Sequence, residues 1–379
     1  MKAVFINNNL FGLLHFREDV IKSFEQDGWD ISIVIPAKEI SSKAFHEIPQ
    51  SWHVFTPELD ANSINPAKDL KYLRDLVYIL KQVKPDIVMT YTVKPNIYGA
   101  IACRICNIPC ICMMAGLGYL FEGDSLKKKI GKSLYKFALR QAKKVTVLNK
   151  PNYDRLLSMR FVKPSKLKWL EGGEGVNLQK YPQADTTYEN VRFLMVARLL
   201  YDKGYEEFVN AARIVKQQYP NVRFEILGGT DFSSLMGVPK HVLEKDEKDG
   251  FVNLLGLTND VPSFMSQPDT VVVIPSKYLE GLNRSLMEAC SIGCPIITTD
   301  IPGCRETVQE GINGYIVPPG NSEKLAEAMI RMIQLTPKQR KEMAQASHTL
   351  AEQKFDVQNV INVYKSLTYE ILNHNRFIV

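Results

Sequence analysis

The sequence predicts an α/β protein made of two similar domains, each a parallel β-sheet with helices on both faces. Three observations support this fold class. Short apolar runs rich in β-branched residues alternate with amphipathic stretches of helical period in both halves of the chain. The length of 379 residues is sufficient for two domains that each bury a core. A polar, proline-containing segment, residues 177–190, lies between the halves and is typical of an interdomain linker.

Five strands are expected in the first half of the chain. Each is a short apolar run, and these runs lie at 3–7, 31–35, 86–90, 109–114 and 144–148. The stretches between them carry apolar residues at helical spacing, and residues 69–82 are an example. Strands that alternate with helices in this way are expected to pair in parallel.

The second half repeats the pattern with six expected strands. These runs lie at 192–196, 223–227, 252–255, 270–274, 295–298 and 315–317. Helical periodicity lies between them, for example at 205–217 and 322–333, and it returns from Phe355 through Leu372. We therefore expect two domains facing a ligand cleft and a C-terminal helix that crosses back to the first domain. Their expected ranges are 1–176, 177–355 and 356–379.

The composition is that of a soluble globular protein, with 45% hydrophobic and 23% charged residues. The formal net charge of +6 is modest, so any anionic partner must be inferred from where the lysines cluster. The N-terminus runs directly into a strand-like segment, which is too short for a secretory signal. The longest apolar stretch, residues 97–121, contains Arg104 and Pro109, which argues against a lipid-spanning helix.

Seven cysteines without an export signal indicate a reducing cytoplasm. Four of them lie close together, and both a zinc site and buried, reduced thiols are possible readings of this cluster. Cys103 and Cys106 fall on an expected apolar helix. Cys110 and Cys112 share one face of the next strand, and neither pair lies in the loop knuckle that zinc pairs use. Buried thiols are therefore favoured.

The turn after the expected strand 270–274 is the strongest indication of function. Pro275 ends the strand, and apolar residues recur at helical spacing from about Leu282. Glu280 then precedes the helix, and Glu288 is expected about two turns inside it. Such a turn lies at the carboxyl end of a strand, where open α/β sheets bind ligands. The helix opening can hold a phosphate while two carboxylates accept hydrogen bonds from hydroxyls, which describes a nucleotide sugar. The alternative is a pair of solvated glutamates.

The loop after strand 192–196 supplies the matching cations. Arg198 follows the strand, and Lys203 lies five residues later, just before Gly204. Arg198 offers a planar fork and Lys203 a point charge, a combination suited to a diphosphate. The alternative is a surface loop with ordinary basic residues. Because both loops follow strands of one sheet, we expect them to face the same ligand.

These residues resemble those of the retaining GT-B glycosyltransferases of family 4. The likeness rests on Arg198 and Lys203, on the two glutamates with seven residues between them, and on the segments 302–306 and 311–314. The resemblance covers essentially the whole chain. It implies that Glu280 contacts the transferred sugar, Glu288 binds the ribose hydroxyls, and the two cations hold the diphosphate of a UDP-sugar.

The resemblance is closest to bacterial polysaccharide and N-glycan enzymes that add N-acetylhexosamine, GalNAc or GlcNAc, to a polyprenyl-diphosphate-linked sugar. The segments 15–17, 94–96 and 116–119 suggest it. Many such enzymes have proline where Asn283 stands, and many have a histidine near the position of Ala115. This chain has no histidine there, so we name no catalytic histidine.

The resemblance and the loop patterns together define the expected site. The expected catalytic residues are Glu280, Arg198 and Lys203. The expected donor-binding residues are Gly12, Arg198, Lys203, Thr258, Glu280, Leu282, Asn283, Arg284 and Glu288. The expected acceptor-binding residues are His15, Arg17 and Lys94, with a packed, neutral helix residue as the alternative for His15.

No metal or cofactor is expected, because the chain contains no Asp-x-Asp motif and the loop after the first strand has one glycine where a dinucleotide fingerprint needs three. Retaining transfer can proceed by front-face displacement, in which the leaving diphosphate itself helps to take the acceptor's proton. The protein then supplies orientation and stabilises phosphate charge.

Residues 125–144 form a basic amphipathic helix with eight cations and no acid. The cations expected to face an anionic membrane are Lys127, Lys128, Lys129, Lys132, Lys136 and Arg140. The expected opposite stripe consists of Leu126, Ile130, Leu134, Phe137, Ala138 and Gln141. Each cation near the lipid surface contributes roughly 1 kcal/mol. The alternative is a helix that packs on its own sheet with a solvated basic side. A nucleic acid is not expected, because no series of stacking aromatics accompanies the patch.

These expectations combine into a cytoplasmic, peripherally membrane-bound enzyme that moves a sugar from a UDP-sugar to a lipid-linked saccharide with retention. A UDP-sugar epimerase of similar architecture and a non-catalytic nucleotide-binding protein are the alternatives.

Overall fold

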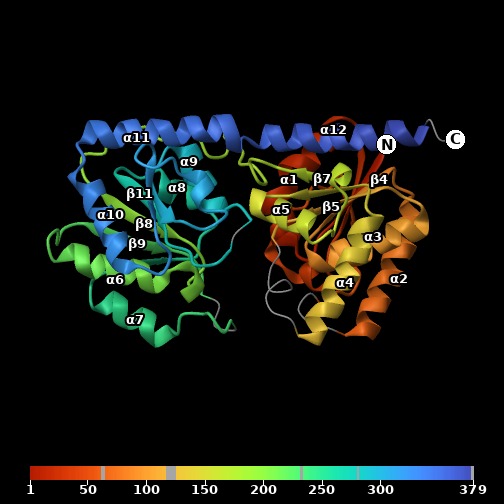
Figure 1. Ribbon diagram of the computed structural model, residues 1–379, viewed down its shortest axis with the longest axis horizontal. Helices are drawn as coiled ribbons and strands as arrows, with labels where there is room; N and C mark the ends of the chain where they lie inside the picture. The colour runs from red at the N-terminus through yellow and green to blue at the C-terminus, as the bar shows by residue number, and fades with distance from the viewer. Residues whose placement is uncertain (61–64, 117–124, 231–233, 280, 377–379) are drawn as a thin grey trace. The chain divides into compact units, whose positions relative to one another are not determined.

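The computed structural model describes residues 1–60, 65–116, 125–230, 234–279 and 281–376 (Figure 1). The chain separates into two compact units. The first unit contains Met1–Glu174 together with Val357–Val379, and the second contains Gly175–Asp356. Each unit is a parallel sheet between layers of helices, and the predicted two-domain α/β fold is confirmed.

The first unit is built on a seven-stranded sheet of order β3-β2-β1-β4-β5-β6-β7. The strands are β1 (Lys2–Ile6), β2 (Asp30–Val34), β3 (His53–Phe55), β4 (Ile87–Tyr91), β5 (Cys110–Met114), β6 (Lys144–Val147) and β7 (Leu167–Trp169). Five of them match the expected strands closely. The two that the pattern missed, β3 and β7, have three residues each and lie at the two edges of the sheet.

In the described part of this unit, six α-helices cover the sheet. They are α1 (Leu10–Gln26), α2 (Pro66–Val83), α3 (Val93–Cys106), α4 (Leu126–Gln141), α5 (Lys150–Ser158) and α12 (Val357–Arg376). Side chains from alternate positions of the strands enter opposite cores, as a pleated strand requires. One core contains α2, α3 and α4, and the other contains α1 and α12 (Figure 1). The C-terminal helix therefore returns to the first unit, as predicted.

The second unit has a six-stranded sheet of order β10-β9-β8-β11-β12-β13. Its strands are β8 (Arg192–Val196), β9 (Arg223–Leu227), β10 (Asn253–Gly256), β11 (Thr270–Ile274), β12 (Ile296–Thr299) and β13 (Gly314–Val317). Its helices are α6 (Tyr205–Lys216), α7 (Lys240–Lys248), α8 (Val261–Met265), α9 (Arg284–Ile292), α10 (Ser322–Gln334) and α11 (Pro337–Leu350). All six strands fall within two residues of their expected bounds.

The expected linker, residues 177–190, packs onto the second unit. Tyr181 accepts a hydrogen bond at its carbonyl oxygen from Ser291 Oγ at 2.6 Å, and the Tyr188 hydroxyl donates to the Gly293 carbonyl oxygen at 2.8 Å. The backbone N–H of Ala184 also donates to the Ile292 carbonyl oxygen. These contacts hold the segment against α9 and its C-terminal turn.

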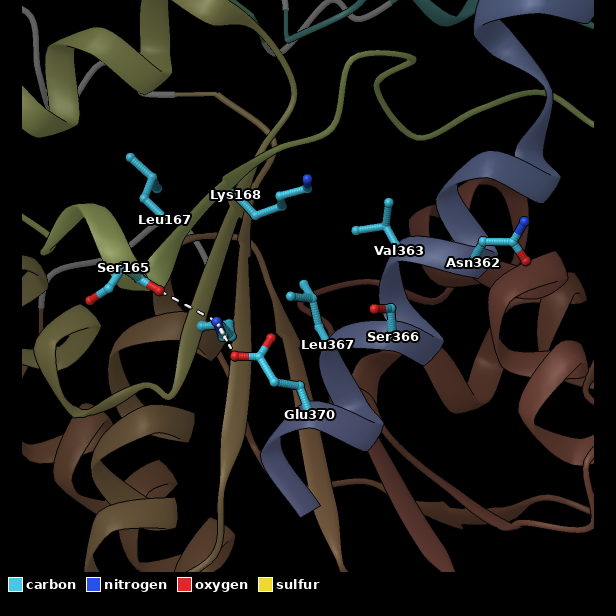
Figure 2. Close-up of a pocket in the computed structure, with 9 residues that line it drawn as sticks. Ser165, Leu167, Lys168, Asn362, Val363, Ser366, Leu367 and Glu370 are labelled. Atoms are coloured by element: carbon cyan, nitrogen blue, oxygen red, sulfur yellow. Dashed lines mark hydrogen bonds and ion pairs between the residues drawn. The ribbon is translucent and has the colours of Figure 1, made fainter. Parts of the chain in front are cut away.

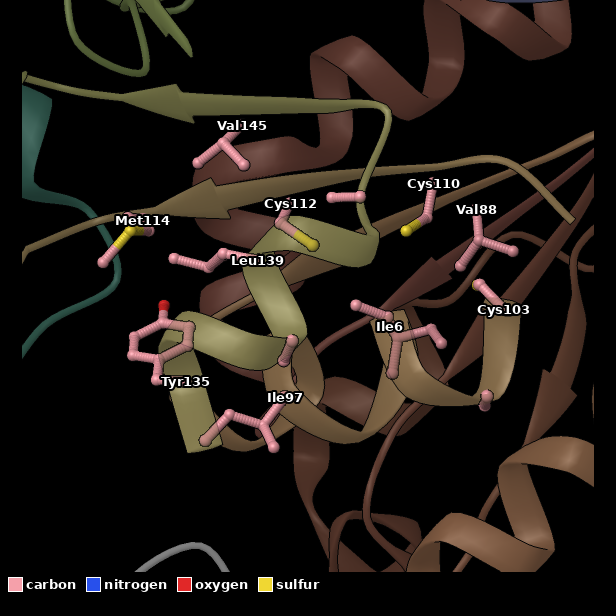
Figure 3. Packing of buried hydrophobic residues seen from close by; sticks show 14 of the residues in the cluster. Ile6, Val88, Ile97, Cys103, Cys110, Cys112, Met114, Tyr135, Leu139 and Val145 are labelled. Atoms are coloured by element: carbon pink, nitrogen blue, oxygen red, sulfur yellow. The ribbon is translucent and has the colours of Figure 1, made fainter. Parts of the chain in front are cut away.

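The clustered cysteines are part of the first core (Figure 3). Cys103, Cys110 and Cys112 are buried, and all seven cysteines are free thiols. A contact with the Cys103 thiol and burial raise the pKa of Cys110 well above its ordinary value. Among the residues that the structure describes, no three His, Cys, Asp or Glu side chains gather as metal ligands would, and no helix is both long and apolar enough to cross a membrane.

Candidate functional site

The sheet of the second unit has its switch point between β8 and β11. From β8 the chain proceeds to β9 and β10 on one side, whereas β11, β12 and β13 lie on the other. The connections that leave the carboxyl ends of β8 and β11 therefore diverge, and open α/β sheets bind ligands at this position. Arg198 follows β8 and Pro275 follows β11, so the two predicted loops flank the switch point.

The two loops touch. The backbone N–H of Lys277 donates to the Asp202 carbonyl oxygen at 2.7 Å, and Lys277 Nζ lies 2.7 Å from Glu207 Oε1 at the start of α6. Gly204 has φ +85°, and a Cβ there would lie 2.1 Å from the Pro275 carbonyl oxygen. Only glycine permits so close an approach. The loop after β8 is thereby fixed against the loop after β11.

The predicted cations lie on this joined surface. Arg198 is exposed, and Lys203 is half-buried with its Nζ 5.3 Å from the centroid of the Tyr278 ring, which belongs to the loop after β11. A cation at this distance is attracted by the face of the ring. Glu280 lies outside the described residues, so its distance from either cation is not part of the structure.

The Gly228-Gly229 pair, which follows β9, lies at the same carboxyl edge of the sheet. It was not among the site residues predicted from the sequence. A Cβ on Gly228 would lie 1.8 Å from the Ala197 carbonyl oxygen, and the Leu199 N–H donates to the Gly229 carbonyl oxygen at 3.0 Å. The Gly228-Gly229 pair therefore lets the backbone pass directly beside the residues that carry Arg198. A glycine doublet directly after an expected strand was the signal available for it.

Thr258, an expected donor-binding residue, lies two residues beyond the end of β10. Its Oγ1 accepts a hydrogen bond from the Asp260 N–H at 3.0 Å, and Asp260 in turn caps α8 by accepting from the Ser263 N–H. The Gly228 N–H donates to the Gly256 carbonyl oxygen at 2.9 Å. The β10 turn is thus tied to the glycine pair, and Thr258 contributes to the shape of the turn.

Helix α9 starts at Arg284, two residues later than expected. Asn283 is its N-cap, with Oδ1 accepting from the Leu286 N–H at 3.1 Å, and Leu282 is buried in the core beneath. Glu288 consequently lies just over one turn inside the helix, and the expected two turns are wrong. The reason is that Asn283 serves as the N-cap, so the first helical residue is Arg284 and not Leu282.

Glu288 is nearly inaccessible, with a side chain only 4% exposed, and it is paired. Its Oε1 lies 2.8 Å from Arg284 Nε. Arg284 also lies over the Tyr181 ring and donates through Nη1 to the Gly175 carbonyl oxygen. Burial, and next the charge of Glu288, raise the pKa of Tyr181 above its ordinary value. Tyr181 and Gly175 joined this cluster without any local sequence pattern to predict them.

The first unit has the same kind of switch point, between β1 and β4. Gly12 lies in the first turn of α1, where its N–H donates to Oδ1 of the capping Asn9 at 2.5 Å. Since α1 starts at Leu10, His15 lies in the second turn of the helix. The His15 ring is half-buried and stacks on the exposed Phe11 ring at 5.0 Å.

Arg17 and Lys94 have internal partners in the first unit. Arg17 is 5% exposed, forms an ion pair with Glu174, and donates through Nη1 to the Gly12 carbonyl oxygen at 2.8 Å. Lys94 Nζ lies 2.6 Å from Asp69 Oδ1, and both side chains are largely buried. This geometry favours structural roles for the two cations that were expected to bind an acceptor.

The basic helix α4 packs differently from the expected stripe. Ile130 and Phe137 are exposed, at 61% and 55%, whereas Tyr135, Ala138 and Leu139 are buried. The expected placement of Ile130 and Phe137 in the packed stripe is therefore wrong. They lie seven residues apart on one face, and the 135, 138 and 139 face is the one that meets the sheet.

The cations of α4 divide into two groups. Lys136 Nζ donates to the Met159 carbonyl oxygen at 3.0 Å and Arg140 Nη2 to the Arg160 carbonyl oxygen at 3.3 Å, so these two hold a neighbouring turn. Lys129 is exposed, and Lys128 and Lys132 are half-buried. The side chain of Lys127 lies outside the described part of the chain.

A hollow of about 450 Å³ lies in the first unit between edge strand β7 and α12 (Figure 2). Lys144 Nζ and Glu370 Oε1 are 2.7 Å apart at its side, and Leu167 and Leu367 supply apolar lining. It contains none of the expected site residues.

Comparison with known proteins identifies the class. The family of glycosyl transferases group 1 matches residues 182–349, and the glycosyl transferase 4-like family matches residues 6–149. The chain belongs to the group 1 and 4-like glycosyltransferases and has the GT-B fold. These matches favour sugar transfer over the epimerase alternative.

Two curated relatives and one solved structure show the extent of the likeness. The chain is 24% identical over 352 residues to N,N'-diacetylbacillosaminyl-diphospho-undecaprenol alpha-1,3-N-acetylgalactosaminyltransferase of Campylobacter jejuni, covering 88% of this chain and 90% of the relative. It is 29% identical over 296 residues to UDP-Gal:alpha-D-GlcNAc-diphosphoundecaprenol alpha-1,3-galactosyltransferase of Escherichia coli, covering 73% and 74%. Anabaena HepE in complex with UDP has a TM-score of 0.78 at 20% identity, over 98% of this chain and 100% of that one.

Proposed function

We propose that the protein transfers a sugar, N-acetylhexosamine, from a UDP-sugar to a polyprenyl-diphosphate-linked saccharide with retention of anomeric configuration. The observation that carries the proposal is the fixed pair of loops at the switch point of the second unit, with Arg198 exposed on one loop and Lys203 over the Tyr278 ring of the other. The names of the two curated relatives, both acting on diphospho-undecaprenol sugars, support this choice of acceptor.

The reaction requires the protein mainly to orient the two substrates and to stabilise the charge on the departing diphosphate. The bond from the anomeric carbon to the phosphate oxygen of UDP breaks, and a bond from that carbon to an acceptor hydroxyl oxygen forms on the same face. The acceptor proton passes to the departing phosphate oxygen. Arg198, Lys203 and the N–H groups that open α9 stabilise the charge that grows on the diphosphate. Glu280 orients the transferred sugar, and Glu288 accepts hydrogen bonds from the ribose.

The ribose role can be tested with Glu288→Gln and Glu288→Ala. Loss of a hydrogen bond to a charged group costs roughly 1.5–3 kcal/mol, so UDP affinity should fall by about tenfold to a hundredfold. Isothermal titration with UDP measures this, and Glu342→Ala, on the exposed side of α11, is the matched control. Wild-type affinity in both Glu288 variants would remove Glu288 from the nucleotide site.

The substrates can be tested by mass spectrometry. UDP-GalNAc, UDP-GlcNAc and UDP-galactose are each incubated with short polyprenyl-diphosphate glycans, and the product mass shows which sugar has moved. Each UDP-sugar is also incubated without acceptor as the control for epimerisation. Transfer of an N-acetylhexosamine is expected, and a changed UDP-sugar in the absence of acceptor would contradict the proposal.

We also propose that the enzyme acts at the cytoplasmic face of the membrane through α4. The exposed Ile130 and Phe137 side chains lie on a helix with Lys128, Lys129 and Lys132, and apolar side chains beside cations suit an anionic bilayer. This mixed surface favours membrane binding more than a basic stripe alone, because the exposed Ile130 and Phe137 side chains add apolar contacts to the ionic ones.

Vesicle sedimentation tests this placement. Lys129→Glu combined with Lys132→Glu should reduce binding to vesicles that contain phosphatidylglycerol, and Phe137→Ser should reduce it at unchanged charge. Lys338→Glu with Lys341→Glu, on exposed positions of α11, makes the same charge change elsewhere. Equal sedimentation of all variants would contradict membrane binding through α4. Lys136 and Arg140 are left intact because they hold the neighbouring turn.

A further inference from the structure

The chain leaves the first unit and enters the second at the peptide between Glu174 and Gly175. The Glu174 carboxylate forms an ion pair with Arg17 of α1. The Gly175 carbonyl oxygen accepts a hydrogen bond from Arg284 of α9. Two guanidinium groups therefore hold consecutive residues, and each belongs to a helix that follows a strand at the switch point of its own unit.

The backbone around this peptide is folded and has fixed partners. Gly173 and Gly175 both have positive φ, at +63° and +71°. The Gly173 N–H donates to the Leu170 carbonyl oxygen at 3.0 Å, and the Val176 N–H donates to the Phe355 carbonyl oxygen at 2.6 Å. Each of these two bonds lies within one unit, so the backbone on both sides of the peptide has partners in its own unit.

Arg284 connects this backbone to the nucleotide carboxylate. Its Nε lies 2.8 Å from Glu288 Oε1 while its Nη1 is directed to Gly175, and its side chain is 13% exposed. The guanidinium is planar and rigid, so these two contacts cannot be adjusted independently. A displacement of the Gly175 carbonyl group that keeps both contacts must therefore move the Glu288 carboxylate as well.

Arg17 makes the equivalent connection in the first unit. Besides Glu174 it holds the Gly12 carbonyl oxygen at 2.8 Å, in the first turn after β1. Its guanidinium carbon lies 5.0 Å from the centroid of the Tyr91 ring at the end of β4. One buried guanidinium thus contacts the first turn of α1, the end of β4 and the residue that precedes Gly175.

We propose that Arg17 and Arg284 are positioning residues that tie the ligand-facing turn of each unit to the Glu174–Gly175 peptide, so that nucleotide affinity depends on the backbone at residue 175. This proposal rests on the proposed nucleotide role of Glu288. It replaces the expectation that these two arginines touch acceptor and donor directly.

A double-mutant cycle separates positioning from direct contact. UDP affinity is measured for Glu288→Gln, Arg284→Met and the double variant. If Arg284 acts through Glu288, each single variant weakens UDP binding by about tenfold and the double variant is no weaker than the weaker single. Arg284→Lys, which keeps the charge and loses the fork, should retain only part of the affinity. Multiplicative losses in the double variant would mean an independent donor contact and would overturn the proposal.

A glycine pair supplies the matched test of the backbone. Gly175→Ala and Gly173→Ala place the same side chain at two positive-φ positions two residues apart, and Gly175 is the one whose carbonyl group meets Arg284. Gly175→Ala should weaken UDP binding several-fold, and Gly173→Ala should change it less than twofold. An equal effect of the two substitutions would count against the coupling.

Hydrogen exchange gives a readout that does not need nucleotide. Residues 171–176 should exchange faster in Arg17→Met and in Arg284→Met than in wild type, and Arg305→Met, at an exposed arginine of the second unit, should leave them unchanged. Unchanged exchange in both variants would overturn the proposed role of Arg17 and Arg284. If the variants exchanged faster but the wild-type protein itself did not bind UDP, the contacts of the two arginines would stand and the proposed function would be contradicted.

Discussion

In both units the first strand of the sheet stands at the switch point and is followed by a glycine-containing turn. In the first unit, the cations near this point, Arg17 and Lys94, are buried against Glu174 and Asp69. In the second unit, Arg198 is exposed and Lys203 lies over an aromatic ring. The comparison teaches that a cation after a strand can be used inside its own unit, as Arg17 and Lys94 are by buried carboxylates, so its position in the sequence does not by itself define a ligand contact.

The largest expected effect is on the cations of the second unit. Arg198→Ala or Lys203→Ala should lower kcat by about a hundredfold to a thousandfold, because each removes a charge that stabilises the leaving diphosphate. Steady-state kinetics with the UDP-sugar measure the loss, and Arg223→Ala, at an exposed position where β9 begins, is the control. A purely raised KM with unchanged kcat would show that the cations bind the ground state alone.

Lys94→Met should give the opposite pattern. It leaves the largely buried Asp69 carboxylate without its ion-pair partner, and an unsatisfied buried group costs about 1–3 kcal/mol. Thermal unfolding should show the lower stability, with the KM for the UDP-sugar unchanged. A raised acceptor KM at wild-type stability would instead return Lys94 to the acceptor site and break the comparison.

Asn283→Ala tests how far the helix opening depends on its cap. Loss of an N-cap costs about 1 kcal/mol, and the UDP affinity should also fall because the start of α9 frays. Asn321→Ala removes the equivalent cap of α10 in the same unit and should cost similar stability without affecting UDP. If both variants kept full UDP affinity, the opening of α9 would not contact phosphate.

The smallest expected effect is a pH dependence in the core of the second unit. Burial raises the pKa of Cys294 to about 12, from an ordinary value of 9.0. The thiol is therefore neutral in the folded protein while the unfolded chain ionises above pH 9, so its stabilising contribution is complete below pH 9 and is lost as pH rises towards 12. Urea unfolding measures the free energy of unfolding at pH 8 and at pH 10. Between these pH values it should fall by about 1 kcal/mol less in Cys294→Ala than in the wild-type protein. An identical loss in both proteins would contradict this burial.

Much of the fold could be predicted because parallel strands covered on both faces are continuous apolar runs. Thr270–Ile274 is such a run, and it is found as β11. The edge strands β3 and β7, with three residues each, are too short to give a periodic signal. Their existence depends on pairing with β2 and β6, which is tertiary information.

The site could be predicted only in part, because residue types reveal chemistry but not partners. The position of Arg198 and Lys203 after a strand, and of Glu288 inside a helix, followed from local pattern. The pairing of Arg17 with Glu174 joins residues 157 positions apart, and no spacing rule connects them. The exposed positions of Ile130 and Phe137 similarly depend on which face of α4 the sheet selects.

The most direct test of the central claim is a crystal structure with UDP bound. We predict that the diphosphate lies at the carboxyl ends of β8 and β11, within hydrogen-bond distance of Arg198 and Lys203, and that the ribose hydroxyls meet Glu288. A diphosphate bound away from these two strands and out of contact with Arg198 and Lys203 would contradict the account.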